Sequence, residues 1–288
     1  MPEPRTLTLG HSPDPDDAFM FYALAAGKIP TGDWRFEHIL QDIQTLNERA
    51  TRGELHISAI SIHAYAHVLD KYALLPCGAS IGDGYGPMLV TSFDTTLSTP
   101  GGERDWVRRS RIAVPGTMTS AYLALCLYLG AKPRDFVVVP FDEIFACVAG
   151  GRADMGLIIH EGQLTYEREG FTKVVDLGEW WLRETGLPLP LGGNVIRKDL
   201  TPAERSEVNV ILRESIRYGL EHRAEGVAHA LPLGRGLDAA EADKFIGMYV
   251  NELTLDYGER GRAAIREFLA RAHAGGFIPA PVELEFVS

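Results

Sequence analysis

The order of the expected elements is the feature that most limits what this chain can fold into. Short apolar segments with the period of strands alternate with amphipathic segments with the period of helices over residues 5–91, and again over residues 111–177. After residue 197 only helical patterns follow. Because this alternation is typical of sheets covered by helices, the chain is predicted to be an α/β protein with parallel sheets.

Capping residues set the limits of several elements. Asp42 is a predicted helix N-cap, Gly53 is a predicted helix stop, and Thr201 to Glu204 combine an N-cap, a first-turn proline and a capping-box glutamate. The predicted strands are residues 5–10, 34–39, 56–60, 73–75, 88–91, 111–115, 136–140, 154–159, 172–177 and 191–197. The predicted helices are residues 17–26, 42–51, 61–69, 118–129, 142–149, 239–251 and 258–274, with another that begins after Thr201.

Two α/β segments, followed by a helical C-terminal segment, indicate a protein of two lobes. Residues 94–103 and 185–193 are rich in Thr, Pro and Gly, so the chain is expected to cross between lobes near residues 95 and 190. The first lobe would be residues 1–93 and 190–288, and the second residues 94–189. Ligands of open α/β sheets bind beyond the carboxyl ends of strands, so a ligand cleft is expected between the lobes.

Charge and composition narrow the class of partner. The chain has 28 Lys and Arg against 39 Asp and Glu, a net charge of −11, so it lacks the field that attracts nucleic acid. Three widely spaced cysteines favour neither a disulfide framework nor a thiolate metal site. The longest nearly apolar stretch, residues 121–131, is shorter than the roughly 18 residues that cross a bilayer. The sequence therefore predicts a cytoplasmic protein with a small-molecule partner, and leaves its oligomeric state open.

The first candidate site is the loop that contains Ser12, Asp14, Asp16 and Asp17, between the first strand and the first helix. Its acids can simply cap the helix and complement its positive end. The alternative is a binding loop, because two prolines rigidify a segment that follows a strand. Both interpretations stay open from the residues alone.

The second candidate site contains Thr119 and Ser120, where a strand runs into a helix. Small hydroxyl residues at a helix N-terminus leave backbone N–H groups that can meet a carboxylate or phosphate. An ordinary Ser/Thr cap is the alternative. No Gly-Lys-Ser/Thr follows, so this is not a Walker loop.

The third candidate is His160, which ends a strongly apolar strand and is followed by Glu161. At that position its imidazole is expected to face the cleft, where it would be available as a general base. A structural histidine is the alternative. His63 and His67 share a helix face but have no obvious third ligand, so no metal site is predicted. The glycines of residues 78–87 precede a strand, which favours a turn or hinge over a phosphate loop.

Several segments together resemble the 1,4-dihydroxy-6-naphthoate synthase family of the futalosine route to menaquinone, and more loosely chorismate dehydratase of the same route. The resemblance implies a periplasmic-binding-protein type II-like fold with two lobes. The pair IIHE and TGLPLPLG favours the naphthoate synthase. The similar segments are SPDPDDAF (12–19), LQDIQTLN (40–47), SIHAYA (61–66), VPGTMTSAY (114–122), GLIIHEGQLTY (156–166), VVDLGEWW (174–181), TGLPLPLG (185–192) and YVNELTLDYGERG (249–261).

The resemblance also implies an activity and a set of site residues. The family converts cyclic dehypoxanthine futalosine, a small carboxylate, to 1,4-dihydroxy-6-naphthoate, with no redox cofactor or metal. His160 matches the family's proposed catalytic base. The implied substrate-binding residues come from three segments: Ser12 and Asp16; Ala59, Ile60 and Ser61; Thr119 and Ser120.

The chain departs from the family pattern at a few of these positions. The family usually has Cys, Asn and Thr where this chain has Asp14, Asp16 and Ala18, and commonly a Lys where this chain has Ala59. The alternative functions are therefore chorismate dehydratase and a binding protein without catalysis that takes a neutral or cationic ligand.

Overall fold

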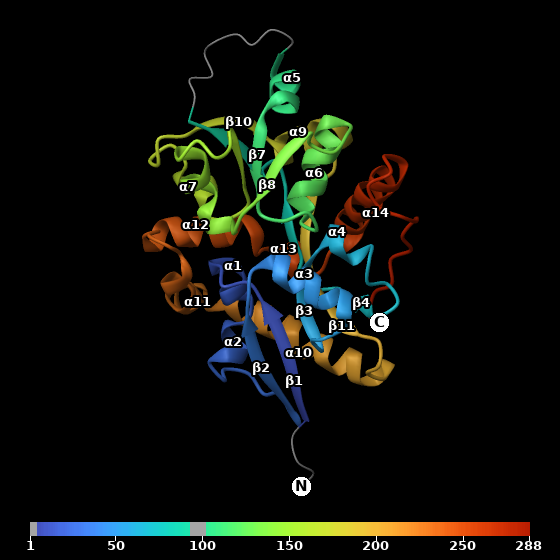
Figure 1. Cartoon of the computed structure of the whole chain (residues 1–288). Coiled ribbons are helices and arrows are strands. Elements are labelled where there is room, and N and C mark those ends of the chain that lie inside the picture. The colour runs from blue at the N-terminus through green and yellow to red at the C-terminus, as the bar shows by residue number, and fades with distance from the viewer. Residues whose placement is uncertain (1–4, 93–101) are drawn as a thin grey trace.

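The computed structural model describes residues 5–92 and 102–288, and it divides into two sheets that lie one above the other in Figure 1. Helices α10 (Pro202–Glu221) and α11 (Arg223–Ala230) lie beside the lower sheet. Helices α6 (Ser120–Leu129), α7 (Ile144–Ala149) and α9 (Leu177–Thr185) lie beside the upper one. The predicted α/β class is confirmed.

The first sheet has the strand order β2-β1-β3-β11-β4, and β5 pairs with β11. Strand β1 is parallel to β2 and β3, whereas β11 is antiparallel to β3, β4 and β5. The sheet is therefore mixed, and the expectation of parallel pairing was wrong here. The strands are β1 (Arg5–His11), β2 (Trp34–Leu40), β3 (Ile57–Ser61), β4 (Tyr72–Leu74), β5 (Ser80–Gly82) and β11 (Leu189–Arg197).

The second sheet has the order β10-β6-β9-β7-β8 and is also mixed. Strand β7 is parallel to β8 and β9, but β6 is antiparallel to β9 and β10. Strand β6 follows β5 of the other sheet without an intervening helix, whereas α9 lies between β10 and β11. Each of the two strands enters its sheet from the other sheet and not through a crossover from a neighbouring strand of the same sheet, and parallel pairing needs such a crossover. The strands are β6 (Met88–Thr91), β7 (Arg111–Val114), β8 (Asp135–Val138), β9 (Met155–Ile158) and β10 (Thr172–Asp176).

Local capping explains where several of the helices begin and end. The Asp42 side chain accepts from the N–H of Thr45, and Gly53 ends the helix in the left-handed region at φ +68°. The Thr201–Glu204 capping box is present, as predicted. The other helices are α3 (Ile43–Arg52), α5 (Gly102–Arg109), α8 (Gly162–Thr165), α12 (Ala239–Tyr249), α13 (Glu252–Leu255) and α14 (Gly258–Ala274).

Three helix expectations need correction. Residues 17–26 form two short helices, α1 (Pro15–Met20) and α2 (Tyr22–Ala25), and the predicted helix 61–69 is only the single turn α4 (Ile62–Tyr65). Helix α9 was not predicted. It starts because the Asp176 side chain accepts from the N–H groups of Gly178 and Glu179, which ends the preceding strand.

A buried contact between α9 and α14 fixes the start of β11. Trp181 is fully buried, its ring lies edge-on to Phe268 at 5.4 Å, and its indole N–H donates to the carbonyl oxygen of Pro188 at 3.1 Å. This places the second expected crossing, residues 185–193, against the core. The segment around residue 95, where the first crossing was expected, lies outside the described residues. Among those described, no helix is both long and apolar enough to span a membrane.

Candidate active site

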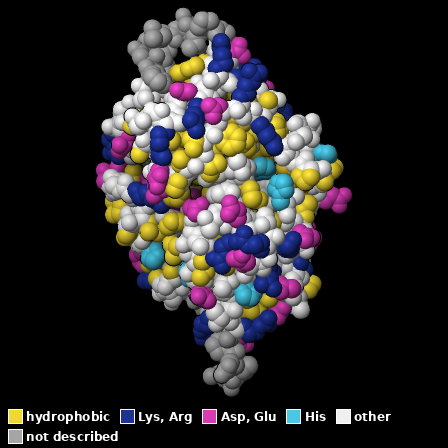
Figure 2. All heavy atoms as spheres, viewed as in Figure 1, with side chains coloured by type: hydrophobic (Ala, Val, Ile, Leu, Met, Phe, Trp, Pro, Cys, Tyr) yellow, Lys and Arg dark blue, Asp and Glu magenta, His cyan; other side chains and the backbone are white. Residues whose placement is uncertain are grey.

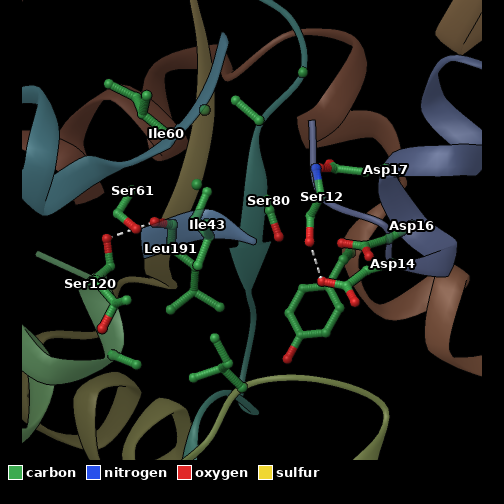
Figure 3. A pocket seen from close by; sticks show the side chains of 18 of the residues that line it. Ser12, Asp14, Asp16, Asp17, Ile43, Ile60, Ser61, Ser80, Ser120 and Leu191 are labelled. Carbon is green, nitrogen blue, oxygen red and sulfur yellow. Dashed lines mark hydrogen bonds between the residues drawn. The ribbon is translucent and has the colours of Figure 1, made fainter. Parts of the chain in front are cut away.

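A cavity of about 770 Å³, including the part open to solvent, lies where the two sheets face each other (Figure 3). Its lining contains all seven predicted substrate-binding residues: Ser12, Asp16, Ala59, Ile60, Ser61, Thr119 and Ser120. Figure 3 shows Ser61 and Ser120 on one side and Ser12, Asp14 and Asp16 on the other. Because β1 and β3 end here and β11 begins here, both the carboxyl ends of strands and the glycines of β11 form the wall.

Asn47, which sequence reasoning missed, holds Ser61 in place. It is fully buried on α3; its side-chain oxygen accepts from the N–H of Ser61 at 2.8 Å, and its amide nitrogen donates to the Ser61 hydroxyl at 3.0 Å. The same nitrogen donates to the carbonyl oxygen of Met118 at 3.3 Å. The available signal was an amide among the buried positions of an amphipathic helix, since a buried amide is retained where it has partners.

The hydroxyl groups at the start of α6 are bound to the protein itself. Thr119 is the helix N-cap, accepting from the N–H of Tyr122 at 3.1 Å and donating to the carbonyl oxygen of Gly116 at 2.9 Å. Ser120 accepts from the N–H of His63 at 3.2 Å. The cap interpretation is therefore confirmed for Thr119. The first two N–H groups of the helix, those of Ser120 and Ala121, have no partner within it.

The acidic loop is folded by its own side chains rather than by helix capping. Asp14 occupies the N-cap position of α1 but makes no capping hydrogen bond. Its carboxylate instead accepts from the Ser12 hydroxyl at 2.5 Å and from Arg235 at 2.8 Å. Asp17 accepts from the N–H of Ser12 at 2.6 Å. Of the two interpretations that the sequence left open, capping does not hold for Asp14, because the loop turns its carboxylate toward Arg235.

Asp16 is the acid that faces the cavity without a side-chain partner among the described residues. Burial, together with the charges of Asp17 and Asp14, raises its pKa well above the usual range. Burial also raises the pKa of Asp17 to about 7. The pocket can therefore hold a protonated carboxyl group near neutral pH.

His160 does not line the cavity; Ile159, one residue before it, does. The ring is buried, and Nδ1 accepts from the N–H of Gly162 at 3.0 Å, so the neutral ring carries its proton on Nε2. Nε2 donates to the carbonyl oxygen of Phe141 at 3.0 Å. Both ring nitrogens are thus bound to backbone, whereas the sequence predicted an imidazole open to the cleft.

The C-terminal helices supply residues that the sequence did not single out. Phe245 and Tyr249 of α12 line the cavity, and the Tyr249 hydroxyl donates to Gln163 at 2.6 Å.

The part of the chain that the structure describes gives no support for a metal site. The rings of His63 and His67 lie edge to face at 5.6 Å, and no group of three or more candidate metal ligands occurs among the described residues. On the face in Figure 2, basic and acidic side chains are interspersed, with no continuous basic surface.

The mixed sheets and the cavity between them define a periplasmic-binding-protein-like fold with an internal small-molecule site. A crystal structure of an Archaeoglobus fulgidus protein aligns with TM-score 0.87 and 42% identity over 95% of this chain and 98% of that one. The alkanesulfonate-binding protein SsuA of Xanthomonas axonopodis aligns with TM-score 0.70 at 15% identity, over 98% of this chain and 97% of that one. The second match bears on the fold alone.

The family model for menaquinone biosynthesis matches residues 7–274, and the chain belongs to that family. It is 39% identical to the 1,4-dihydroxy-6-naphthoate synthase of Streptomyces coelicolor over 280 residues, covering 96% of this chain and 95% of the relative. The enzyme of the same name from Thermus thermophilus is 39% identical over 279 residues, 96% of this chain and 98% of the relative. The protein is an enzyme of menaquinone biosynthesis, and the resemblance found in the sequence is confirmed.

Proposed function

We propose that the enzyme is a lyase-type 1,4-dihydroxy-6-naphthoate synthase that converts cyclic dehypoxanthine futalosine to 1,4-dihydroxy-6-naphthoate. The observation that carries the proposal is the near-full-length identity to two enzymes of that name. The cavity supports it, because seven of the eight resembling segments, which are far apart in the sequence, contribute lining residues. Closure of the cleft over the substrate would strengthen electrostatic interactions and keep water from reactive intermediates.

We propose that the N-terminus of α6 binds the substrate carboxylate through backbone N–H groups, with the helix dipole adding attraction. His160 is proposed as the general base. To take a proton at Nδ1 it must give up the hydrogen bond from Gly162, so the turn that carries it has to shift when substrate binds. Asp16, already in the lining, is the alternative base.

We also propose that the cleft closes around the substrate, with lobe boundaries placed where the chain passes from one sheet to the other. Strand β6 pairs within the second sheet, so we place the first crossing between β5 and β6 and the second between β10 and β11. The first lobe then comprises residues up to 82 and from 189 onward. We propose that the enzyme acts in the cytoplasm.

The test is to incubate the purified enzyme with cyclic dehypoxanthine futalosine and follow naphthoate by absorbance. Formation of 1,4-dihydroxy-6-naphthoate supports the proposal. Turnover of chorismate instead would identify the dehydratase. Binding of naphthoate without any turnover would favour a binding protein.

A further inference from the structure

Arg235, in the turn between α11 and α12, contacts both sides of the cavity. Its Nη1 atom lies 2.8 Å from Asp14 Oδ1 and 3.1 Å from Glu161 Oε1, and Nη2 donates to the carbonyl oxygen of Pro13 at 3.1 Å. Asp14 and Pro13 belong to the acidic loop of the first lobe, whereas Glu161 follows β9 of the second. One guanidinium group therefore joins the two lobes.

The backbone at Arg235 has a conformation that is unusual for a residue with a side chain. Its φ angle is +40°, and it is the one non-glycine residue with positive φ among those described. A side chain in the left-handed region is unfavourable unless the surroundings hold it there. Here the holding contacts are the two carboxylates and the Pro13 carbonyl. We therefore interpret the strained turn as adapted to the closed arrangement of the lobes.

Arg235 also contacts the neighbours that fix His160. The guanidinium lies over the Phe141 ring, 4.6 Å from its centroid, and the carbonyl oxygen of Phe141 accepts from His160 Nε2. Glu161, whose side chain is 4% exposed, lies 3.6 Å from His160 Nδ1. Burial raises the pKa of Glu161, but His160 and Arg235 outweigh it, so that pKa stays below its ordinary value.

We propose that Arg235 is a positioning residue that fastens the acidic loop of one lobe to the His160–Glu161 turn of the other when the cleft closes. A carboxylate as buried as Glu161 is costly without a cationic partner, so loss of Arg235 should drive the turn toward water. The kinetic part of this inference rests on the proposed function. The part concerning closure does not.

The experiment compares five variants with the wild-type enzyme, one of which is Glu161→Gln alone. Arg235→Ala removes the contact, whereas Arg235→Lys keeps the positive charge but not the planar guanidinium group that reaches several acceptors at once. The double variant, Arg235→Ala with Glu161→Gln, leaves no unpaired carboxylate at residue 161. Arg168→Ala is the matched control. It breaks the Arg168–Glu241 pair, another ion pair between the lobes, which is more exposed and touches neither the cavity nor His160.

We expect Arg235→Ala to lower kcat at least about tenfold, with a smaller change in KM, and Arg235→Lys to recover part of the loss. Arg168→Ala should stay within about twofold of the wild type. Adding Glu161→Gln to Arg235→Ala should cost less than Glu161→Gln does alone, because the two residues act as one unit. If Arg235→Ala does not fold, the double variant takes its place.

Wild-type kcat and KM in Arg235→Ala, or additive effects in the double variant, would overturn the proposal. Small-angle scattering without ligand tests the proposed link between the lobes, which we call the Arg235 clamp, and does not depend on turnover. If the clamp holds the lobes together, the radius of gyration should be larger for Arg235→Ala than for Arg168→Ala. Equal radii would also overturn it. If the wild type shows no turnover while the radii differ as expected, the proposed function fails and the clamp stands.

Discussion

The Ser120 hydroxyl donates to the carbonyl oxygen of Leu191 with 2.5 Å between the two oxygen atoms. This bond ties the first turn of α6, in the second lobe, to the start of β11, in the sheet of the first. Asn47 makes a parallel link to the carbonyl oxygen of Met118. The pocket is therefore held on one side by neutral hydrogen bonds and on the other by the ion pairs of Arg235.

Replacing Ser120 with Ala should weaken both the fold and ligand binding. The change leaves the Leu191 carbonyl and the His63 N–H without this partner, so we expect a loss of about 1–3 kcal/mol in the free energy of unfolding. Thr119→Ala should cost about 1 kcal/mol through the lost cap. Urea unfolding measures both values, and calorimetry with 1,4-dihydroxy-6-naphthoate measures binding. If a folded variant that carries both Thr119→Ala and Ser120→Ala binds the ligand with unchanged affinity, both residues have a structural role only.

Asn47→Leu should be among the more destabilising single changes near the pocket. It leaves the N–H of Ser61 and the carbonyl oxygen of Met118 without this hydrogen-bond partner, and each such buried group costs about 1–3 kcal/mol. The control is Glu48→Ala on the exposed face of the same helix, expected within about 0.5 kcal/mol of the wild type. Equal unfolding midpoints for the two variants would contradict this role for Asn47.

The acidic loop should make stability fall as pH rises. Burial raises the pKa of Asp17 to about 7 from its ordinary 3.8. Between these values the folded chain keeps a proton that the unfolded chain has released, so this group's contribution is lost as pH rises through the window. Asp17→Asn should remove that loss and gain stability relative to the wild type from about pH 4 to 7, measured by urea unfolding.

His63 provides the comparison with opposite sign. Burial lowers its pKa to about 4 from 6.5, so the unfolded chain binds the extra proton and stability rises with pH over that window. His63→Gln should flatten this rise. The same slope in the wild type and both variants would show that neither group controls the pH dependence.

His160→Asn and Asp16→Asn discriminate between the two proposed bases. Asn keeps size and hydrogen bonding but cannot accept a proton as a base, so loss of the true base should lower kcat at least about 10²-fold with little change in ligand affinity. We expect this result for His160→Asn and a smaller effect for Asp16→Asn. Near-normal turnover in His160→Asn, together with loss in Asp16→Asn, would assign the base to Asp16.

The sequence was sufficient for the fold class and for seven of the residues that line the pocket. Ser12 follows β1, Ser61 ends β3 and Thr119 comes after β7. Strand ends converge in an α/β protein whatever the detailed pairing. Strand direction was not predictable in the same way. The patterns of β6 and β11 are those of any buried strand, and their reversal depends on where the chain crosses between sheets.

The contacts of Asn47 and Arg235 could not be predicted because they join residues that are distant in the chain. Asn47 meets Met118, and Arg235 meets Asp14, only after both lobes are folded. His160 was placed correctly at the end of β9. Its ring direction is decided by the Phe141 carbonyl and the Gly162 N–H, which no periodicity reveals.

The position of β11 between β3 and β4 sets the order in which the chain can fold as it is made. All strands of the second sheet lie within residues 88–176, so that sheet can be completed while the rest is still being synthesised. The first sheet cannot close until residue 197 has left the ribosome, although its β1 is made first. Until then, the edges of β3 and β4 have no partner strand, and the nascent protein is most exposed to aggregation during this interval.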